Sequence, residues 1–287
     1  MKTILFPTDF TSSASMALQW AKTFAAKYKA TLVLLHVHQP PLPDTTLPTV
    51  GDLGVGVAAA YDLEQIGHQQ LDHLAGQLRA EGLTIDTEWR MGGIEDEILS
   101  TARDRNADLI ITGRHNMSTF FDWLAGSAAT DVALDASCPV LVVPAPDEHE
   151  SPKPVQVNEV IFATQLEFDE RAILQQATQL TADFGGRLHF LKVNADNQPD
   201  VFDDEQFKQQ LQRTLGSDPL RVNLIHARTV TGGLSDYLTK HEADILVMTT
   251  RERGFLDGLL NPSLTKRMVL QAHLPVLVYH SAKVETP

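Results

Sequence analysis

Glycine and serine residues in one stretch of the chain have the types and the spacing of a phosphate-binding loop. Gly113 follows an apolar run, and Gly126-Ser127 precedes a second apolar segment. Glycine lets the backbone approach a ligand because it has no Cβ, and a helix N-terminus offers unpaired N–H groups and the positive end of the helix dipole. A glycine after a strand also marks an ordinary turn. The interpretation therefore depends on the elements that position these residues.

Hydrophobic patterns predict those elements. Leu109 to Ile111 is a strand of the buried type, Gly126-Ser127 opens an apolar helix that ends near Ala136, and Val140 to Val143 is a further strand. The same criteria predict strands at Thr3 to Pro7, Thr31 to His36 and Ile85 to Trp89, and helices over Met16 to Ala25 after the N-cap candidates Thr11, Ser12 and Ser13, over Tyr61 to Glu81, and over Ile94 to Arg105. Strands that alternate with helices in this way predict a parallel sheet with helices on its faces.

The segment between the second strand and the long helix is unusual in composition. From Gln39 to Ala60 it is rich in proline and glycine, so we expect an irregular loop, either a lid over the ligand side of the sheet or a disordered connection. In the helix that follows, the apolar residues expected on or near one face are Leu63, Ile66, Leu71, Leu74 and Leu78.

The composition sets bounds on function. Of the 287 residues, 43% are hydrophobic, which is typical of a globular protein with a real core. The net charge of -14 disfavours broad binding to DNA or RNA, because most of the surface would repel a polyanion. No apolar run approaches a membrane span, and the only cysteine, Cys138, is expected to be a small buried hydrophobe rather than a reactive thiol. We therefore expect a cytoplasmic protein that binds neither nucleic acid nor membrane.

The pattern of strands and helices occurs twice along the chain. ILFPTDF from Ile4 matches VIFATQL from Val160, and ADLIIT from Ala107 matches ADILVM from Ala243. A Pro-rich, charged segment separates the two copies. The chain is therefore predicted to contain one domain over residues 1–146, a linker over 147–157, a second domain over 158–281 and a tail over 282–287.

The motifs together resemble the universal stress protein family in its tandem two-domain form. The resemblance is carried by Pro7-Thr8-Asp9 after the first strand, by Leu35-His36-Val37 at the end of the second, by Gly113 with Gly126-Ser127, and by the CPVLVV strand that begins at Cys138. It covers nearly the whole chain apart from the linker and the tail. It implies two doubly wound, Rossmann-like α/β domains, each with a five-stranded parallel sheet and a nucleotide site at the carboxyl ends of its strands.

The family's nucleotide site can be carried over position by position. The adenosine end would be lined by Pro7, Thr8, Asp9 and Val37. The ribose and phosphates would be contacted by Thr112, Gly113, His115, Asn116, Gly126, Ser127 and Ala128. Arg114 either adds positive charge to this site or points to solvent. The implied ligand is ATP, with ADP or AMP as related alternatives, and Mg2+ would neutralise phosphate charge that so acidic a protein cannot fully offset.

Both halves depart from the family pattern. Nucleotide-binding members carry Gly where this chain has Asn116, which tolerates a left-handed backbone but adds a side chain in space that a phosphate needs. In the second half, Gln165 stands in place of Asp9, and Pro262, which has no N–H to offer a phosphate, stands at the helix start. We expect the second site to be empty and the second half to be a structural partner.

The fifth strands of the two halves, Val140 to Val143 and Val276 to Tyr279, are expected at sheet edges, where exposed strands invite pairing. Single-domain members of the family pair these strands between two chains, so the resemblance implies an intrachain pseudo-dimer here. Whether two such chains associate further as a homodimer stays open.

Other chemistries find less support. His36 and His38 lie two apart on a strand, but no carboxylate or cysteine stands at a spacing that would complete a metal site, and the favoured interpretation is a strand end with one half-buried and one solvated imidazole. No pair of catalytic base and nucleophile is evident, so we expect at most weak ATPase activity. Two functions stay open: a stress-response protein that binds an adenine nucleotide, or an interaction scaffold that has lost the nucleotide, with a protein partner that the sequence does not identify.

Overall fold

A computed structural model of the chain describes residues 1–39, 53–114, 128–145, 154–166, 170–197, 202–216, 221–251 and 262–281. The first half contains β1 (Thr3–Pro7), α1 (Ser12–Tyr28), β2 (Thr31–His38), α2 (Leu53–Ala80), β3 (Thr84–Met91), α3 (Ile94–Asp104), β4 (Leu109–Arg114), α5 (Ala128–Asp135) and β5 (Val140–Pro144). The second half contains β6 (Glu159–Ala163), α6 (Arg171–Asp183), β7 (Arg187–Ala195), α7 (Asp204–Leu215), β8 (Arg221–Ala227), α8 (Val230–Lys240), β9 (Ile245–Arg251), α9 (Pro262–Gln271) and β10 (Val276–Ser281).

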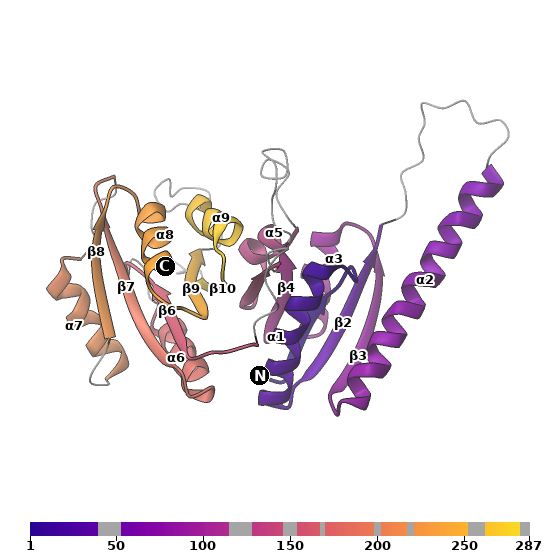
Figure 1. Ribbon diagram of the computed structural model, residues 1–287, viewed down its shortest axis with the longest axis horizontal. Coiled ribbons are helices and arrows are strands. Elements are labelled where there is room, and N and C mark those ends of the chain that lie inside the picture. Colours follow the sequence, from indigo (N-terminus) through magenta and orange to yellow (C-terminus); the bar gives the residue numbers. More distant parts are fainter. Residues whose placement is uncertain are drawn as a thin grey trace, which may run out of the picture.

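The strands form one continuous sheet across both halves (Figure 1). Its order is β3-β2-β1-β4-β5-β10-β9-β6-β7-β8, and the strands within each half are parallel. At the centre, β5 and β10 pair antiparallel, with Leu141 opposite Leu277. The two predicted doubly wound domains and their intrachain pairing through the fifth strands are therefore confirmed.

Alternating side chains build a separate core on each face of the sheet. Within β1, Ile4 and Phe6 belong to one apolar cluster, and Leu5 belongs to the other. The first cluster includes buried residues of α1, α2, α6 and α7, and the second includes those of α3, α5, α8 and α9. Because strand side chains alternate between faces, strands that are apolar throughout require helices on both sides.

Helices of the two halves also meet on both faces, beside the β5–β10 junction. On one face, Tyr28 of α1 donates a hydrogen bond from its hydroxyl to Asp183 of α6 at 2.9 Å, and Phe184 packs against Phe24 with ring centroids 4.8 Å apart. On the other face, Lys266 of α9 lies 3.6 Å from Asp131 of α5. These contacts join the halves through side chains in addition to the shared sheet.

The start of α2 corrects one prediction. The helix begins at Leu53, so the expected loop from Gln39 to Ala60 is wrong for residues 53–60, while residues 40–52 lie outside the described part of the chain. Helix-favouring alanines near its start outweigh two glycines. An α-helix of 28 residues is about 42 Å long, whereas the eight-residue β3 spans about 26 Å. The N-terminal turns of α2 therefore extend beyond the strands (Figure 1).

Part of the expected apolar face of α2 is exposed towards the overhanging end of the helix. Leu71 and Leu78 are buried against the sheet as predicted, but Leu63 is 59% exposed and Ile66 50% exposed. The strands are also longer than predicted, because the pairing of β2 with β3 continues from His36↔Trp89 to His38↔Met91. Within the described ranges, no helix combines the length and the apolar character needed to cross a membrane.

Candidate functional site

Most of the described residues that were expected to bind the nucleotide lie at or just after the carboxyl ends of neighbouring strands. The sheet places β1 between β2 and β4, so the ends of these three strands meet at one edge. Of the described site residues, Pro7 ends β1, Thr8 and Asp9 follow it, Val37 lies in β2, Thr112 and Gly113 lie in β4, and Ala128 begins α5. The other expected site residues, His115, Asn116, Gly126 and Ser127, lie outside the described ranges.

The turn after β1 is held by hydrogen bonds that fix the Asp9 carboxylate. Thr8 donates its N–H to Leu35 O at 2.8 Å, and its hydroxyl accepts the N–H of Phe10 at 3.0 Å. Phe10 takes the left-handed conformation, with φ 61°. Asp9 Oδ1 accepts from both the N–H and the hydroxyl of Thr11, at 3.0 and 2.6 Å. The exposed carboxylate of Asp9 is thus oriented by its own turn.

Thr11 shows how this arrangement changes the start of α1. Thr11 is the N-cap residue, as one of the predicted candidates, but its side chain makes no capping bond. Its hydroxyl instead donates to Asp9. Thr11, which the sequence analysis assigned to the cap of the helix, therefore holds the side chain of the site residue Asp9.

His36 lies behind the same turn. Its Nδ1 is 2.9 Å from Thr8 O, and its ring stacks on Phe10 with centroids 4.8 Å apart. Burial is the main cause that lowers the pKa of His36. One of the two imidazoles of His36 and His38 was expected to be solvated, but both side chains are half-buried, and His38 stacks on Trp89. Among the described residues, no cluster of three His, Cys, Asp or Glu side chains could hold a metal ion.

Arg114 does not point to solvent, which was one of the two orientations expected for it. The side chain is only 5% exposed, and its Nη2 donates to Ala272 O at 2.8 Å. Burial lowers the pKa of Arg114. Ala272 directly follows α9, so the guanidinium lies at the negative end of a helix of the other half. Arg114, next to Gly113, therefore links the candidate site to the second half instead of facing solvent.

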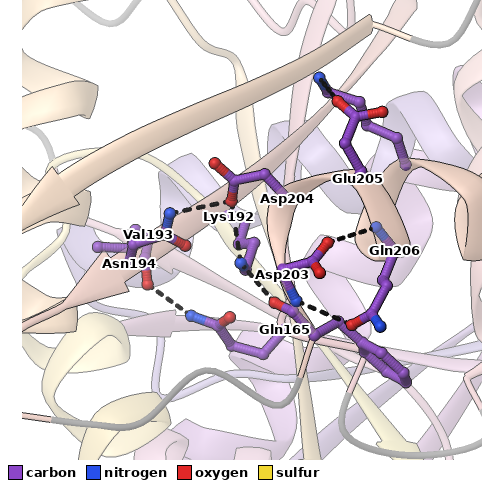
Figure 2. Close-up of polar contacts among 10 residues, drawn as sticks. Gln165, Lys192, Val193, Asn194, Asp203, Asp204, Glu205 and Gln206 are labelled. Atoms are coloured by element: carbon purple, nitrogen blue, oxygen red, sulfur yellow. Dashed lines mark hydrogen bonds and ion pairs between the residues drawn. The ribbon is translucent and has the colours of Figure 1, made fainter.

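The second half repeats the backbone of the turn after β1 but not its exposed carboxylate. Thr164 donates its N–H to Leu191 O at 3.1 Å, and Leu166 has φ 57°. At the position of Asp9, the Gln165 side chain turns back and donates from Nε2 to Val193 O at 2.6 Å (Figure 2). Val193 is the counterpart of Val37, so Gln165 bonds to the strand end that would face a base.

Beside Gln165 lies a buried charge that the sequence analysis missed. Lys192, the counterpart of His36, is fully buried and donates from Nζ to Phe202 O at 2.7 Å and to Asp204 Oδ1 at 3.1 Å (Figure 2). Asn194 donates to the same carboxylate oxygen at 3.0 Å, and this bond is the main cause that lowers the pKa of Asp204. The network ties the first turn of α7 to β7. A lysine within an apolar strand was the signal available in the sequence.

Cys138 has the character expected of a structural thiol. Burial, with a smaller contribution from the charge of Asp108, raises its pKa to about 12. A neutral thiol is a poor nucleophile, because the thiolate is the reactive form. The arrangement around Cys138 therefore supports no covalent chemistry.

Comparison with known proteins agrees with the fold and the repeat. The chain matches the model of the universal stress protein family over residues 1–144 and 159–280, and it belongs to this family. A universal stress protein of Mycolicibacterium smegmatis is 25% identical, and the alignment covers 96% of each chain. Universal stress protein MJ0577 of Methanocaldococcus jannaschii is 27% identical over 50% of this chain and 94% of that protein.

Solved structures show the same architecture over the whole chain. The crystal structure of a universal stress protein from Archaeoglobus fulgidus superposes with a TM-score of 0.71 at 19% sequence identity, covering 96% of this chain and 97% of that chain. Similarity at this level of identity shows the fold, and the fold here is that of two tandem domains of the family.

Proposed function

We propose that the first half binds an adenine nucleotide, with ATP as the principal ligand, at the carboxyl ends of β1, β2 and β4. The observation that carries the proposal is the Asp9 carboxylate, which is exposed at this edge and fixed by Thr11. An ionised carboxylate only accepts hydrogen bonds, and the amino group of adenine is a donor. Ligands of open α/β sheets collect at this edge, and the family resemblance assigns the same positions.

The remaining residues suit the rest of the ligand. Gly113 has no Cβ to separate its backbone from a phosphate, and its N–H and C=O lie where β4 ends beside β5. When bound, Mg2+ would neutralise phosphate charge, held mainly by the nucleotide, because the described residues contain no metal-binding cluster. The binding residues of this proposal are the eleven positions carried over above, including the four outside the described ranges.

We propose one nucleotide site per chain. The Gln165 side chain already donates to Val193 O, so an adenine at this edge of the second half would have to displace an internal hydrogen bond. Pro262, the first residue of α9, has no N–H for a phosphate. The second half then acts as the structural partner of the first.

On this basis the protein is a cytoplasmic stress-response regulator that senses an adenine nucleotide and hydrolyses it slowly, if at all. A single observation favours a second candidate, a scaffold without nucleotide: Asn116 replaces a glycine of the family's motif. Both candidates leave a protein partner to be identified, and titration with nucleotide separates them.

Calorimetric titration of the purified full chain with Mg-ATP tests the proposal, after a denatured sample has been checked for co-purified nucleotide. We expect one site per chain. Asp9→Ala should weaken binding by about tenfold or more, because a hydrogen bond to a charged group contributes about 1.5–3 kcal/mol.

Gln165→Ala is the matched control at the same position of the repeat, and it should leave affinity and stoichiometry unchanged. Absence of binding together with an empty extract would favour the scaffold. Two sites per chain would contradict the assignment of a single site.

A further inference from the structure

Five rings lie at the contact of α2 with β2, β3 and the turn after β1. Trp89 of β3 stacks on His68 of α2 with centroids 3.8 Å apart, and it also contacts His36 at 4.8 Å and His38 at 5.8 Å. On its other side, His36 stacks on Phe10. We call Phe10, His36, His38, His68 and Trp89 the Trp89 ring cluster.

The backbone of α2 rests directly on this cluster. A Cβ added at Gly67 would lie 2.6 Å from Trp89 Cη2 and 3.7 Å from His36 Nε2, so only glycine permits this approach. Beyond the cluster, towards its N-terminus, α2 exposes Leu63 and Ile66. The cluster is therefore the part of the contact between α2 and the sheet that lies nearest to the overhanging N-terminal turns of α2.

The hydrogen bond of His36 determines where a second proton must go. Thr8 O can only accept, so Nδ1 carries the hydrogen of the neutral ring, and protonation occurs at Nε2. Nε2 is the atom that faces Gly67 of α2. Protonation thus places a positive charge in the contact between the helix and the sheet.

The charges around His36 act in both directions. His38 and His68 disfavour its protonation, whereas Asp9 favours it, and burial remains the main cause that lowers the pKa of His36. On α2, Glu64 lies 3.9 Å from His68 Nε2. The Asp9 carboxylate thus opposes, in part, the effect of the two neighbouring imidazoles on the protonation of His36.

The second half shows what a permanent cation at this position requires. Lys192 replaces His36, and the helix that packs there, α7, supplies the Asp204 carboxylate to it at 3.1 Å (Figure 2). At the corresponding contact, α2 presents Gly67 next to His36 Nε2 and His68 against Trp89. The first half therefore accommodates a neutral group where the second half accommodates a charge with its counterion.

We propose that the Trp89 ring cluster is a proton-sensitive clasp, which holds the N-terminal part of α2 on the sheet while His36 is neutral and releases it on acidification. The direction follows from linkage. A histidine whose pKa is lowered in the docked state binds protons more readily in the released state, so docking weakens as the pH falls below about 6.5. This device operates with or without a nucleotide.

Hydrogen exchange of the full chain without nucleotide, with exchange times scaled for the intrinsic effect of pH, tests the clasp. Protection of peptides within residues 61–70 should fall by up to about tenfold per pH unit below about pH 6.5, the change expected when one proton binds only the released state. Peptides of α6, which carries no histidine, should keep their protection.

His68→Gln and His36→Gln should each reduce this pH dependence. His73→Gln is the control, since His73 is an exposed histidine of the same helix. The His68 side chain is 42% exposed, so its replacement is compatible with folding. Constant protection of residues 61–70 across this range, or a pH dependence that persists unchanged in both His68→Gln and His36→Gln, would overturn the proposal.

Discussion

At the scale of single residues, the two halves differ through a few functional groups on nearly the same backbone. Asp9 and Gln165 follow equivalent strands and precede left-handed residues with φ 61° and 57°. The Asp9 carboxylate can only accept hydrogen bonds, and Thr11 holds it at the surface. The Gln165 amide also has a donor, and its N–H donates to Val193 O. One substitution therefore accounts for an exposed carboxylate in one half and an internal bond to the neighbouring strand in the other.

The pair formed by Lys192 and Asp204 should respond asymmetrically to mutation. Asp204→Ala leaves a fully buried ammonium without its carboxylate, and we expect it to lower the free energy of unfolding by about 2 kcal/mol or more, at the low end for a buried pair because Asp204 is 39% exposed. Lys192→Met should cost less, because Met fills the buried space and Asp204 keeps its contact with water. Urea unfolding measures both.

Lys208→Ala provides the control for this comparison. Lys208 lies 3.0 Å from Glu205, also on α7, but both side chains are exposed. Its removal should change the stability by less than about 0.5 kcal/mol. A larger loss in Lys192→Met than in Asp204→Ala would contradict the assignment of the buried ammonium as the costly member of the pair.

The position and contacts of a residue can be predicted better from the sequence when its partners are close to it in the chain. The repeat and the strand pattern place Asp9 and Gly113 at one edge of the sheet, and the structure does the same. The burial of Arg114 was not predictable, because its partner Ala272 is 158 residues away in the other half. Lys192 is similar, since its apolar strand indicates burial but does not identify the carboxylate that accompanies it.

At the scale of secondary-structure elements, α2 departs most from the sequence prediction, because neighbouring elements determine how much of it is buried. Its hydrophobic spacing is helical over Leu63 to Leu78, yet Leu71 and Leu78 are buried against the sheet while Leu63 and Ile66 are exposed. The hydrophobic pattern reports the helical period and not the length of the surface that the helix covers. Two glycines in its first turns also led to the prediction of a loop there.

Two glycines of α2 should respond to alanine with opposite signs. Gly67→Ala places a Cβ 2.6 Å from Trp89, and we expect a loss of about 1–3 kcal/mol from the clash. Gly76→Ala meets nothing within 4 Å, so the higher helix propensity of alanine should stabilise by up to about 1 kcal/mol. Urea unfolding at neutral pH compares them, and equal effects would mean that α2 does not rest on Trp89.

At the scale of the whole molecule, each half covers the edge strand of the other half within the shared sheet. An isolated half would expose β5 or β10 as an apolar edge strand, which is a hazard for aggregation. Their antiparallel pairing and the helix contacts on both faces remove that edge within one chain. The family resemblance implied this pairing, because single-domain members pair the same strands between two chains, and the pairing within one chain is the intrachain form of that two-fold interface.

Arg114 should contribute measurably to the union of the halves. Arg114→Met removes the donor from Ala272 O at the end of α9, and a buried acceptor left without its donor costs about 1–3 kcal/mol. We expect urea unfolding of the full chain to show this loss, while Arg103→Met, at an exposed arginine of α3, changes stability by less than about 0.5 kcal/mol.

Because Arg114 directly follows Gly113, Arg114→Met should also weaken Mg-ATP binding if the second half positions the end of β4. Unchanged stability would mean that the shared sheet alone holds the halves together, and unchanged affinity would mean that the first half forms its site independently.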